Sequence, residues 1–417
     1  MRFLSLAFGI LLIGFGGIQT FALIDPAARK TLCRTWLCWE PAMVDESYTS
    51  YLHGSEGPEE FSTDLKQNLR HDPASGFRWC DFGEAVAASG DRETAHYCIR
   101  RAVALSPNSA LVLLRAANVI LLIGDNSEAL HLLAGVLKLT SEFDPIVFST
   151  FDRFGEGVDA ALKSGLPDDK RAGQSFLRYL IAKKRDPRDV AKAWDWLVAK
   201  SLIDKNLSVE YVNYLVAARQ FNAATEAWVR VIGPERGDYL RPNRVFNGNF
   251  ALRPSGARLD WHSSALPDGV QLTWALGEGH AGGHSLRLDF DAQQNISFNH
   301  VYQDVIVEPG RYEFMALVKA GQLTTDQGVG FHIFDLEVPA RLDITVPPAS
   351  GTMPWTEQKI TFLIPPPTRL LRIELRREPS RKFDNKIKGT LWVDSVKLQP
   401  FPALGRPIRE QSLQSTP

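Results

Sequence analysis

The sequence has no excess charge of either sign and few cysteines. Its 417 residues carry 47 Lys and Arg against 48 Asp and Glu, a formal net charge of -1. The chain therefore lacks the broad positive field that non-specific nucleic-acid binding uses, and we expect no nucleic-acid partner. Four Cys are too few for a disulfide scaffold. Hydrophobic residues at 44% and charged residues at 23% are typical of folded protein, and the length suggests two or three domains.

The sequence also lacks the common catalytic motifs. It contains no P-loop, no His-Glu-x-x-His and no Gly-x-Ser-x-Gly pattern. A carboxylate pair such as Asp335 and Glu337 would serve glycoside hydrolysis only at a suitable spacing and pKa. We therefore predict that the protein is not an enzyme, with a polysaccharide-processing enzyme as the least favoured alternative.

One long uncharged run stands at the amino terminus. Residues 3–24 carry no charge and are long enough to span a bilayer as a helix. We interpret residues 1–24 as a signal anchor or a cleaved signal peptide, since Thr20-Phe21-Ala22 resembles a cleavage site. Arg29, Lys30 and Arg34 favour a cytoplasmic carboxy-terminal bulk by charge alone. The other features favour export, so we expect a membrane-anchored or secreted protein with its bulk in the periplasm or outside the cell.

Residues 71–240 show the spacing of helical hairpins. Small residues and a Gly-Asp turn recur 34 residues apart. The first copy has Trp79, Gly83, Gly90-Asp91, Ala95, Ile99, Ala102 and Pro107, and the second has Ala117, Gly124-Asp125 and Ala129. This pattern resembles the tetratricopeptide repeat (TPR). Two further candidate hairpins pair 175–183 with 189–200 and 208–219 with 223–232.

The repeat resemblance implies a curved surface that docks protein segments. We therefore expect a protein partner in a TPR-like groove. A generic helical bundle remains the alternative, because only the first two hairpins keep the small residues in register.

The four cysteines fall into two natural pairs. If Gly83 faces Ala95 across the first hairpin, Cys80 lies near Cys98 on the facing helix. Cys33 and Cys38 form the second pair, within a linker predicted over residues 25–70. Export favours oxidation of both pairs, whereas free, partly buried thiols are the alternative. Four Cys allow three connectivities, and their spacing does not suit a metal site.

Residues 243–400 change to short alternating strands separated by Gly, Pro, Asn and Asp, which predicts an all-β sandwich. Leu371, Ile373 and Leu375 alternate with polar residues, as do Tyr312 and Phe314. Each such strand should have one packed face and one wet face. The fold class is thus an all-α helical-hairpin solenoid followed by an all-β jelly roll, and 401–417 is expected to be a disordered tail.

This region resembles the jelly-roll carbohydrate-binding modules of the CBM4/9 (CenC-like) type over almost its whole length. The matching positions are Asn247-Gly248-Asn249-Phe250, Trp261, 283–288, Tyr302-Gln303, 307–312, Trp355 and 389–398. The resemblance implies polysaccharide binding, and packing positions for Trp261 and Trp355. Many family members hold a structural calcium ion between the opening and closing strands. Here Ala251 replaces a frequent acidic residue, which leaves Asp394 as a tentative ligand and calcium doubtful.

Sugar recognition needs flat aromatic faces together with amide or guanidinium groups. The candidates are Trp274, Tyr302, Gln303, Phe331, His332 and Arg372. A basic run over 376–388 either meets an acidic polysaccharide or is a solvated strand connection.

The order of these parts predicts a non-enzymatic envelope protein that docks a partner and binds polysaccharide, in exopolysaccharide assembly or export. The competing hypothesis is a purely structural scaffold whose sandwich binds nothing.

Overall fold

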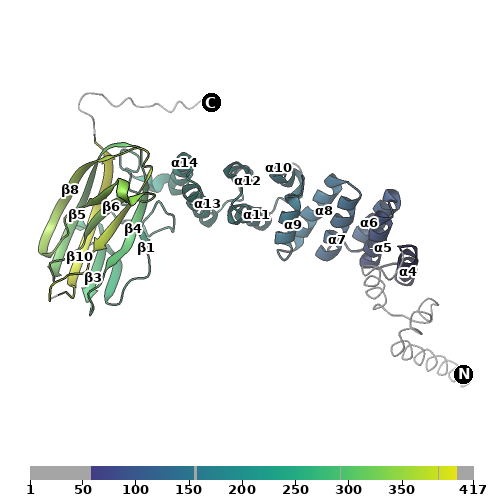
Figure 1. Ribbon diagram of the computed structural model, residues 1–417, viewed down its shortest axis with the longest axis horizontal. Helices are drawn as coiled ribbons and strands as arrows, with labels where there is room; N and C mark the ends of the chain where they lie inside the picture. The colour runs from purple at the N-terminus through teal and green to yellow at the C-terminus, as the bar shows by residue number, and fades with distance from the viewer. Residues whose placement is uncertain (1–57, 155–156, 292, 384, 402–417) are drawn as a thin grey trace, which may run out of the picture. The chain divides into compact units, whose positions relative to one another are not determined.

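The computed structural model describes residues 58–401 except 155–156, 292 and 384, and it confirms helical hairpins followed by a β-sandwich (Figure 1). The predicted signal segment 1–24, Cys33, Cys38 and the tail from 402 onward lie outside these residues. Among the helices of the described ranges, none is both long and apolar enough to cross a membrane.

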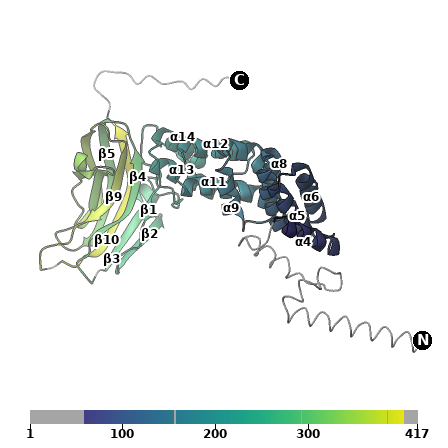
Figure 2. The ribbon, with the colours of Figure 1, turned by 45° about the vertical axis from the view of Figure 1, so that its right-hand side comes forward.

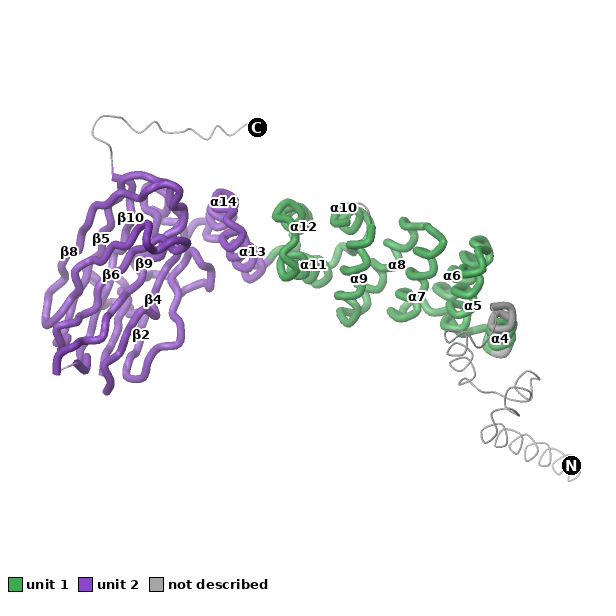
Figure 3. Tube along the Cα trace, in the orientation of Figure 1, with its two compact units in different colours: residues 1–203 green, residues 204–417 purple. Residues whose placement is uncertain are grey.

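The chain divides into two compact units, Met1–Ile203 and Asp204–Pro417 (Figure 3). The second unit contains the last helical hairpin as well as the sandwich. The last helical turn before the strands ends at Arg236, and the first strand begins at His262.

The first unit consists of helical hairpins. Its helices are α4 (Pro58–His71), α5 (Gly76–Ala88), α6 (Arg92–Leu105), α7 (Ala110–Leu122), α8 (Asn126–Leu139), α9 (Asp144–Phe151), α10 (Gly157–Ala160), the π-helical η1 (Ala161–Gly165), α11 (Lys170–Ala182) and α12 (Pro187–Ala199). Helix α4 lies in the stretch predicted as a linker. It buries Leu65 and Leu69, and it packs against α5, so the apolar spacing of these two residues is what makes it part of the fold.

The repeated Gly-Asp turn has one structure in both copies. Gly90 and Gly124 adopt left-handed φ angles of 91° and 89°, which glycine reaches without strain. Asp91 then accepts a hydrogen bond from the Thr94 amide at 3.0 Å, and Asp125 accepts one from the Glu128 amide at 3.0 Å. Each Asp therefore caps the second helix of its hairpin, which explains why the dipeptide recurs.

In the first hairpin, the side chains nearest to Gly83 are those of Cys98 and Ile99, and not that of Ala95. A Cβ atom at Gly83 would lie 3.1 Å from Cys98 Cβ and 3.2 Å from Ile99 Cδ1. The facing positions are therefore displaced by about one helical turn from the predicted register.

The predicted disulfide between Cys80 and Cys98 is not formed, because the two cysteines do not face each other in the displaced register. Both residues are free, buried thiols. Cys80 Sγ is directed at the next hairpin, where it donates to Val112 O at 3.8 Å. Burial raises the pKa of Cys80 to about 12 and that of Cys98 to about 11, so both thiols stay protonated at neutral pH.

The second unit begins with α13 (Lys205–Ala217), α14 (Phe221–Ile232) and the 3-10 turn η2 (Gly233–Arg236). Ten antiparallel strands follow in two five-stranded layers (Figure 2). The first sheet has the order β1-β4-β9-β6-β7 and the second β2-β3-β10-β5-β8. The strands are β1 (His262–Ser263), β2 (Val270–Leu276), β3 (His284–Asp291), β4 (Phe298–Ile306), β5 (Gly310–Leu323), β6 (Gly330–Asp335), β7 (Asp343–Thr345), β8 (Gly351–Ile364), β9 (Leu370–Arg377) and β10 (Lys388–Pro400).

The predicted alternation forms the sandwich core. Leu371, Ile373 and Leu375 of β9 are buried in the same cluster as Tyr312 and Phe314 of β5. Trp261 is fully buried, as predicted.

The prediction that Trp355 is a core residue is wrong, because Trp355 does not lie in this core. It is half-buried on β8, with its ring edge-on to His280 at 6.1 Å. Its neighbour Thr356 pairs with Val318, next to an irregularity in the β5–β8 register, so the simple alternation does not hold here.

The opening segment lies beside the closing strand. Arg244 N donates to Leu398 O at 2.7 Å, and Val396 N donates to Gly248 O at 2.9 Å. A Cβ atom at Gly248 would stand 2.0 Å from Val396 O, so no other residue fits. The Asn-Gly pair is thus required for the close approach of two backbones.

The last helical hairpin is fixed to one end of the sandwich within this unit. On α13, Asn213 Oδ1 accepts from Arg258 N at 2.7 Å and its Nδ2 donates to Gly256 O at 3.2 Å. Arg219 pairs with Glu337 at 2.7 Å. These bonds explain why α13 and α14 group with the strands.

A buried guanidinium organises the opposite end. Arg377 is 1% exposed, and it donates to the carbonyls of Gln327, Ile296 and Asn385. These carbonyls belong to three different loops. Burial lowers the pKa of Arg377, which reflects the cost of desolvating its charge.

We expect Arg377→Met to destabilise the protein by about 2 kcal/mol, because three carbonyls lose their donor. Urea unfolding measures this. Arg381→Met, at an exposed position of the loop that follows, is the matched control and should change stability by less than about 0.5 kcal/mol. Equal effects of the two variants would contradict the role given to Arg377.

We expect Cys80 and Cys98 to resist alkylation in the native protein, because both thiols are buried and protonated. Peptide mass spectrometry after iodoacetamide treatment should find both unmodified without urea and both modified in urea. A peptide pair joined through the two residues would show instead that the hairpin is oxidised.

Candidate functional site

Three of the six predicted sugar-binding residues share the outer face of the β1-β4-β9-β6-β7 sheet. Tyr302 on β4 lies opposite Glu374 on β9, and Glu374 lies opposite His332 on β6. Arg372 lies one step along β9, opposite Asp304. The alternate residues of these strands fill the core, so these side chains point away from it. We call Tyr302, Asp304, His332, Phe334, Arg372, Glu374 and Arg376 the outer-face cluster.

Tyr302 lies between two flat polar groups. The Arg372 guanidinium stands 3.9 Å from the centre of its ring, and the His262 ring stacks at 5.5 Å with an interplanar angle of 18°. Tyr302 is nevertheless half-buried and not fully covered. The guanidinium therefore lies over the face of the Tyr302 ring, and the His262 imidazole is stacked with the same ring.

Asp304 holds this pair in place. It is 1% exposed and accepts from Arg372 Nε at 2.8 Å and from Arg258 Nη2 at 2.8 Å. Two guanidiniums around one carboxylate balance the cost of burying its charge. Since Asn213 holds the Arg258 backbone, the contacts run from α13 to the sheet face.

His332 is the second centre of the cluster. Its Nδ1 lies 3.0 Å from Glu374 Oε1, and its Nε2 lies 2.8 Å from Asp343 Oδ1. Its ring stacks on Phe334 at 4.7 Å, and the Arg376 guanidinium lies 3.1 Å from Nδ1. Burial would lower the pKa of His332, but the hydrogen bonds to Glu374 and Asp343 outweigh it, so the pKa is raised.

The other three predicted residues do not join the cluster. Phe331 is 1% exposed and packs on Phe314 in the core, because its neighbour His332 takes the outward position. Gln303 is fully buried, where its amide accepts from Phe246 N at 3.1 Å and donates to Phe246 O at 2.9 Å. It ties the opening segment to β4 and has no group left for a ligand.

Trp274 lies on the other sheet. Its partner in the register is Leu286, a core residue, and its ring packs against the core from β2. Its buried Nε1 has no hydrogen-bond partner. Trp274 is only partly buried, so its part in sugar binding stays a prediction.

Asp304, Phe334, Glu374 and Arg258 were not among the site residues predicted from the sequence. The first three follow candidate residues at a spacing of two, and a strand places such residues on one face. That signal was available in the sequence. Strand alternation could not have identified Arg258, because Arg258 reaches the cluster from the loop before β1.

The tentative calcium ligand does not fit a calcium site. Asp394 is buried, and its Oδ2 accepts from His280 N at 2.9 Å while its Oδ1 accepts from Ser395 Oγ at 3.2 Å. Among the residues with described side chains, no group of three possible metal-ligating residues includes it. A hard cation needs several oxygens, and Asp394 instead secures the 280–282 turn.

One group of side chains in these ranges has metal-ligating chemistry: His96, Asp125 and Glu128. His96 Nδ1 lies 3.3 Å from Glu128 Oε2, and its Nε2 lies 4.0 Å from Asp125 Oδ2. The two nitrogens face different carboxylates, and the carboxylates sit at the positive end of α8. The geometry fits an ion pair between hairpins better than a cation site.

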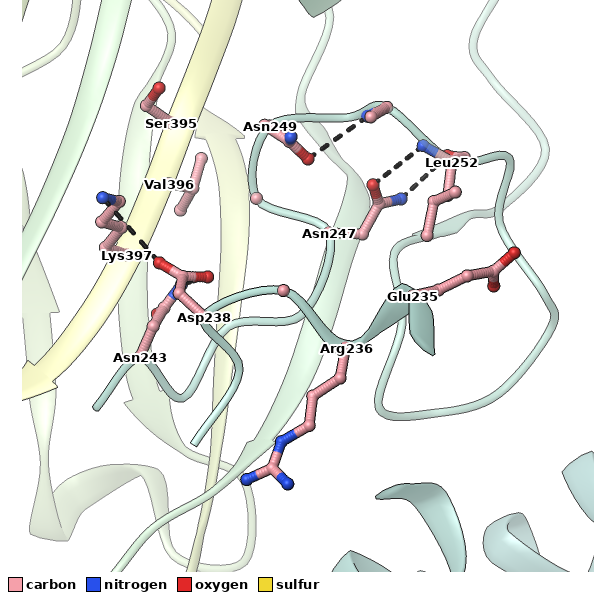
Figure 4. A pocket seen from close by; sticks show the side chains of 13 residues that line it. Glu235, Arg236, Asp238, Asn243, Asn247, Asn249, Leu252, Ser395, Val396 and Lys397 are labelled. Carbon is pink, nitrogen blue, oxygen red and sulfur yellow. Dashed lines mark hydrogen bonds and ion pairs between the residues drawn. The ribbon is translucent and has the colours of Figure 1, made fainter. Parts of the chain in front are cut away.

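A pocket of about 440 Å³ lies where the opening segment meets β10 (Figure 4). Asn247 lines it, but its side chain is bonded in both directions to the Leu252 backbone, at 2.8 and 3.0 Å. Asp238 pairs with Lys397 at 3.8 Å across the pocket wall. Most of its polar groups thus serve the fold, and none of the six predicted residues lines it.

No family model and no curated protein matches the chain. Among solved structures, MamA is similar at 16% identity over 38% of this chain and 88% of that one, with a TM-score of 0.25. PilF of Pseudomonas aeruginosa is similar at 12% identity over 47% and 91%, with a TM-score of 0.25. The CBM22-1 xylan-binding domain of Paenibacillus barcinonensis Xyn10C is similar at 14% identity over 36% and 90%, with a TM-score of 0.26.

Two longer proteins are matched only in part. The chain covers 28% of the CBM22-1–GH10 modules of a Clostridium thermocellum xylanase and 21% of a bacteriophage CBA120 tailspike protein. All these TM-scores are low, so function has to be argued from the residues themselves.

The raised pKa of His332 predicts a pH-dependent contribution to stability. Protonated His332 stabilises the fold fully below its unfolded pKa of about 6.5, and this contribution is lost as the pH rises through the higher folded value. The stability difference between wild type and His332→Gln should therefore be larger at about pH 5.5 than at about pH 8.5. Unfolding at both pH values measures it.

His131→Gln, at an exposed site on α8, is the matched control and should show no such difference. A His332→Gln effect that grows with pH would reverse the sign and contradict the assignment.

Proposed function

We propose that the sandwich binds polysaccharide on the outer face of the β1-β4-β9-β6-β7 sheet. The observation that carries this proposal is the convergence of Tyr302 and Arg372, both chosen from sequence as sugar-binding candidates, on one face with the partly exposed Phe334; His332 shares this face but is only 5% exposed. Two aromatic rings and several guanidinium, imidazole and carboxylate groups lie there together.

The chemistry of this face suits a sugar chain. Aromatic rings pack against the apolar faces of sugar rings, and charged planar groups bind their hydroxyls. Arg372 and Tyr302 are held rigidly by Asp304, so little side-chain entropy is lost on binding. Arg376, 41% exposed, offers a further donor on the same strand.

We also propose that the helical unit docks a protein partner and that the protein acts in the cell envelope, in exopolysaccharide assembly or export. Exposed apolar residues at matching repeat positions support the docking role. Phe77 and Leu111, 34 residues apart, are 40% and 45% exposed, and Leu122 is 66% exposed at the position equivalent to Ala88. The signal-like residues 1–24 support the compartment.

The partners of Asp335 and Glu337, the carboxylate pair considered for glycoside hydrolysis, support a binding role without catalysis. Asp335 accepts hydrogen bonds from two backbone amides and from Thr368, and it pairs with Arg341 at 3.0 Å. Glu337 pairs with Arg219. These two residues hold a turn, and neither is free to act as an acid or a nucleophile.

The competing function is a scaffold whose sandwich binds nothing. The mutual pairing within the outer-face cluster favours it, because Asp304 and Glu374 already have cationic partners. Binding measurements separate the two functions.

We expect Tyr302→Ser to weaken polysaccharide binding about tenfold, because the main aromatic face is lost. Affinity electrophoresis of the full chain through gels containing single polysaccharides, neutral and acidic, would measure this. Tyr97→Ser, 58% exposed on α6, is the matched control and should bind as wild type does. No retardation by any polymer would favour the scaffold.

A further inference from the structure

We infer that the sugar-binding surface continues from the sheet face onto the loop between β9 and β10, and that its ligand is an acidic polysaccharide bearing carboxylates. This inference rests on the proposed function and names its substrate class. The evidence is the direction of β9, the free cations of the loop, its exposed Phe383 and the way the loop is anchored.

Strand β9 leads from the cluster to the loop. Its outward residues are Arg372, Glu374 and Arg376, at a spacing of two. The strand is central, with β4 on one side and β6 on the other. A polymer that lies along β9 over Tyr302 and Arg372 therefore meets Arg376 next and then the loop that starts at Glu378.

Two basic residues in or next to the loop form ion pairs within the fold, and two others form none with the residues that the structure describes. The paired ones are Lys382, 3.5 Å from Asp326, and Lys388, 3.0 Å from Asp291. Arg381 and Lys386 are exposed, and within the described part of the chain no carboxylate lies at ion-pair distance from either. A ligand that carries carboxylates supplies the missing partners, whereas a neutral sugar does not.

Phe383 stands between these cations and is 104% exposed. A Phe side chain that is fully exposed contributes nothing to the core. Its ring is available to pack against a sugar. The loop thus repeats the combination of an aromatic ring and a guanidinium found in the outer-face cluster.

The loop is held at its base by hydrogen bonds from two sides. Arg377 bonds the Asn385 carbonyl, and Ser380 exchanges two hydrogen bonds with Asn295, at 2.7 and 3.0 Å. Arg377 is buried and cannot meet a ligand. The basic run therefore has two parts with different roles. Arg377 is buried and anchors the loop, whereas the basic residues after it are exposed.

An anionic lipid surface is the other class of partner with this charge. The loop has a single exposed apolar residue, however, whereas peripheral membrane segments bury a broad apolar face. Continuity with Tyr302 and Arg372 along β9 favours the polysaccharide.

The test uses the full chain with polygalacturonate and polyglucuronate, each beside its methyl-esterified form, and a set of neutral glucans. The variants are Arg381→Glu with Lys386→Glu, and separately Phe383→Ser. The matched control is Arg100→Glu with Lys138→Glu, which reverses one Arg and one Lys at exposed sites on α6 and α8. Thermal melting checks that every variant folds.

We expect at least one acidic polymer to bind, and its methyl ester to bind about tenfold more weakly or less. The double charge reversal should weaken binding by more than about tenfold, and Phe383→Ser by about fivefold. The control should behave as wild type does, and added salt should weaken binding to the acidic form only.

Three results would overturn the inference. Binding of neutral polymers that depends on Tyr302 but not on Arg381, Lys386 or Phe383 would leave the proposed function standing and confine the site to the sheet. Loop-dependent binding to phosphatidylglycerol vesicles, with no acidic polymer bound, would assign the loop to lipid. No binding to any polymer would remove the proposed function itself.

Discussion

The buried carboxylate of Asp304 is the contact on which the outer face of the sandwich depends. One oxygen pair receives two guanidiniums, Arg258 from the loop before β1 and Arg372 from β9. Arg258 is held in turn by Asn213 of α13. The position of Arg372 over the Tyr302 ring therefore depends on a helix, a loop and two strands together. A single carboxylate joins the last helical hairpin to the face proposed to bind sugar.

Different interactions stabilise the two ends of the sandwich. At one end, α13 and α14 contact the sheet through polar bonds such as Asn213 to Gly256 and Arg219 to Glu337. At the other end, one guanidinium, Arg377, binds the carbonyls of three loops. The loop proposed to meet an acidic polymer belongs to this second end, and Arg377 fixes its base. Loops carry function more readily when a rigid frame positions them.

The helical unit shows how a short repeat specifies geometry. In each of the first two hairpins, a left-handed Gly and a capping Asp set the turn, and the helices then pack through small residues. The repeat fixes where each helix begins, but the side chains decide the register between helices. In the first hairpin, Gly83 packs against Cys98 and Ile99, about one turn from the expected Ala95. That displacement is enough to separate two cysteines that the sequence had suggested as a pair.

The sequence alone determined the fold class, the hairpin turns and the inward residues of the strands, because each depends on local periodicity. Alternation implied that Arg372 points outward from its strand, but it was not used to choose between Tyr302 and Gln303 or between Phe331 and His332, and it could have added Asp304, Phe334 and Glu374 as site residues. Only the tertiary structure decided that these strands are neighbours, since pairing between β4, β9 and β6 joins residues distant in the chain. It likewise decided that Gln303 serves the opening segment and that Phe331 fills the core, because burial is a property of what packs on a side chain from elsewhere.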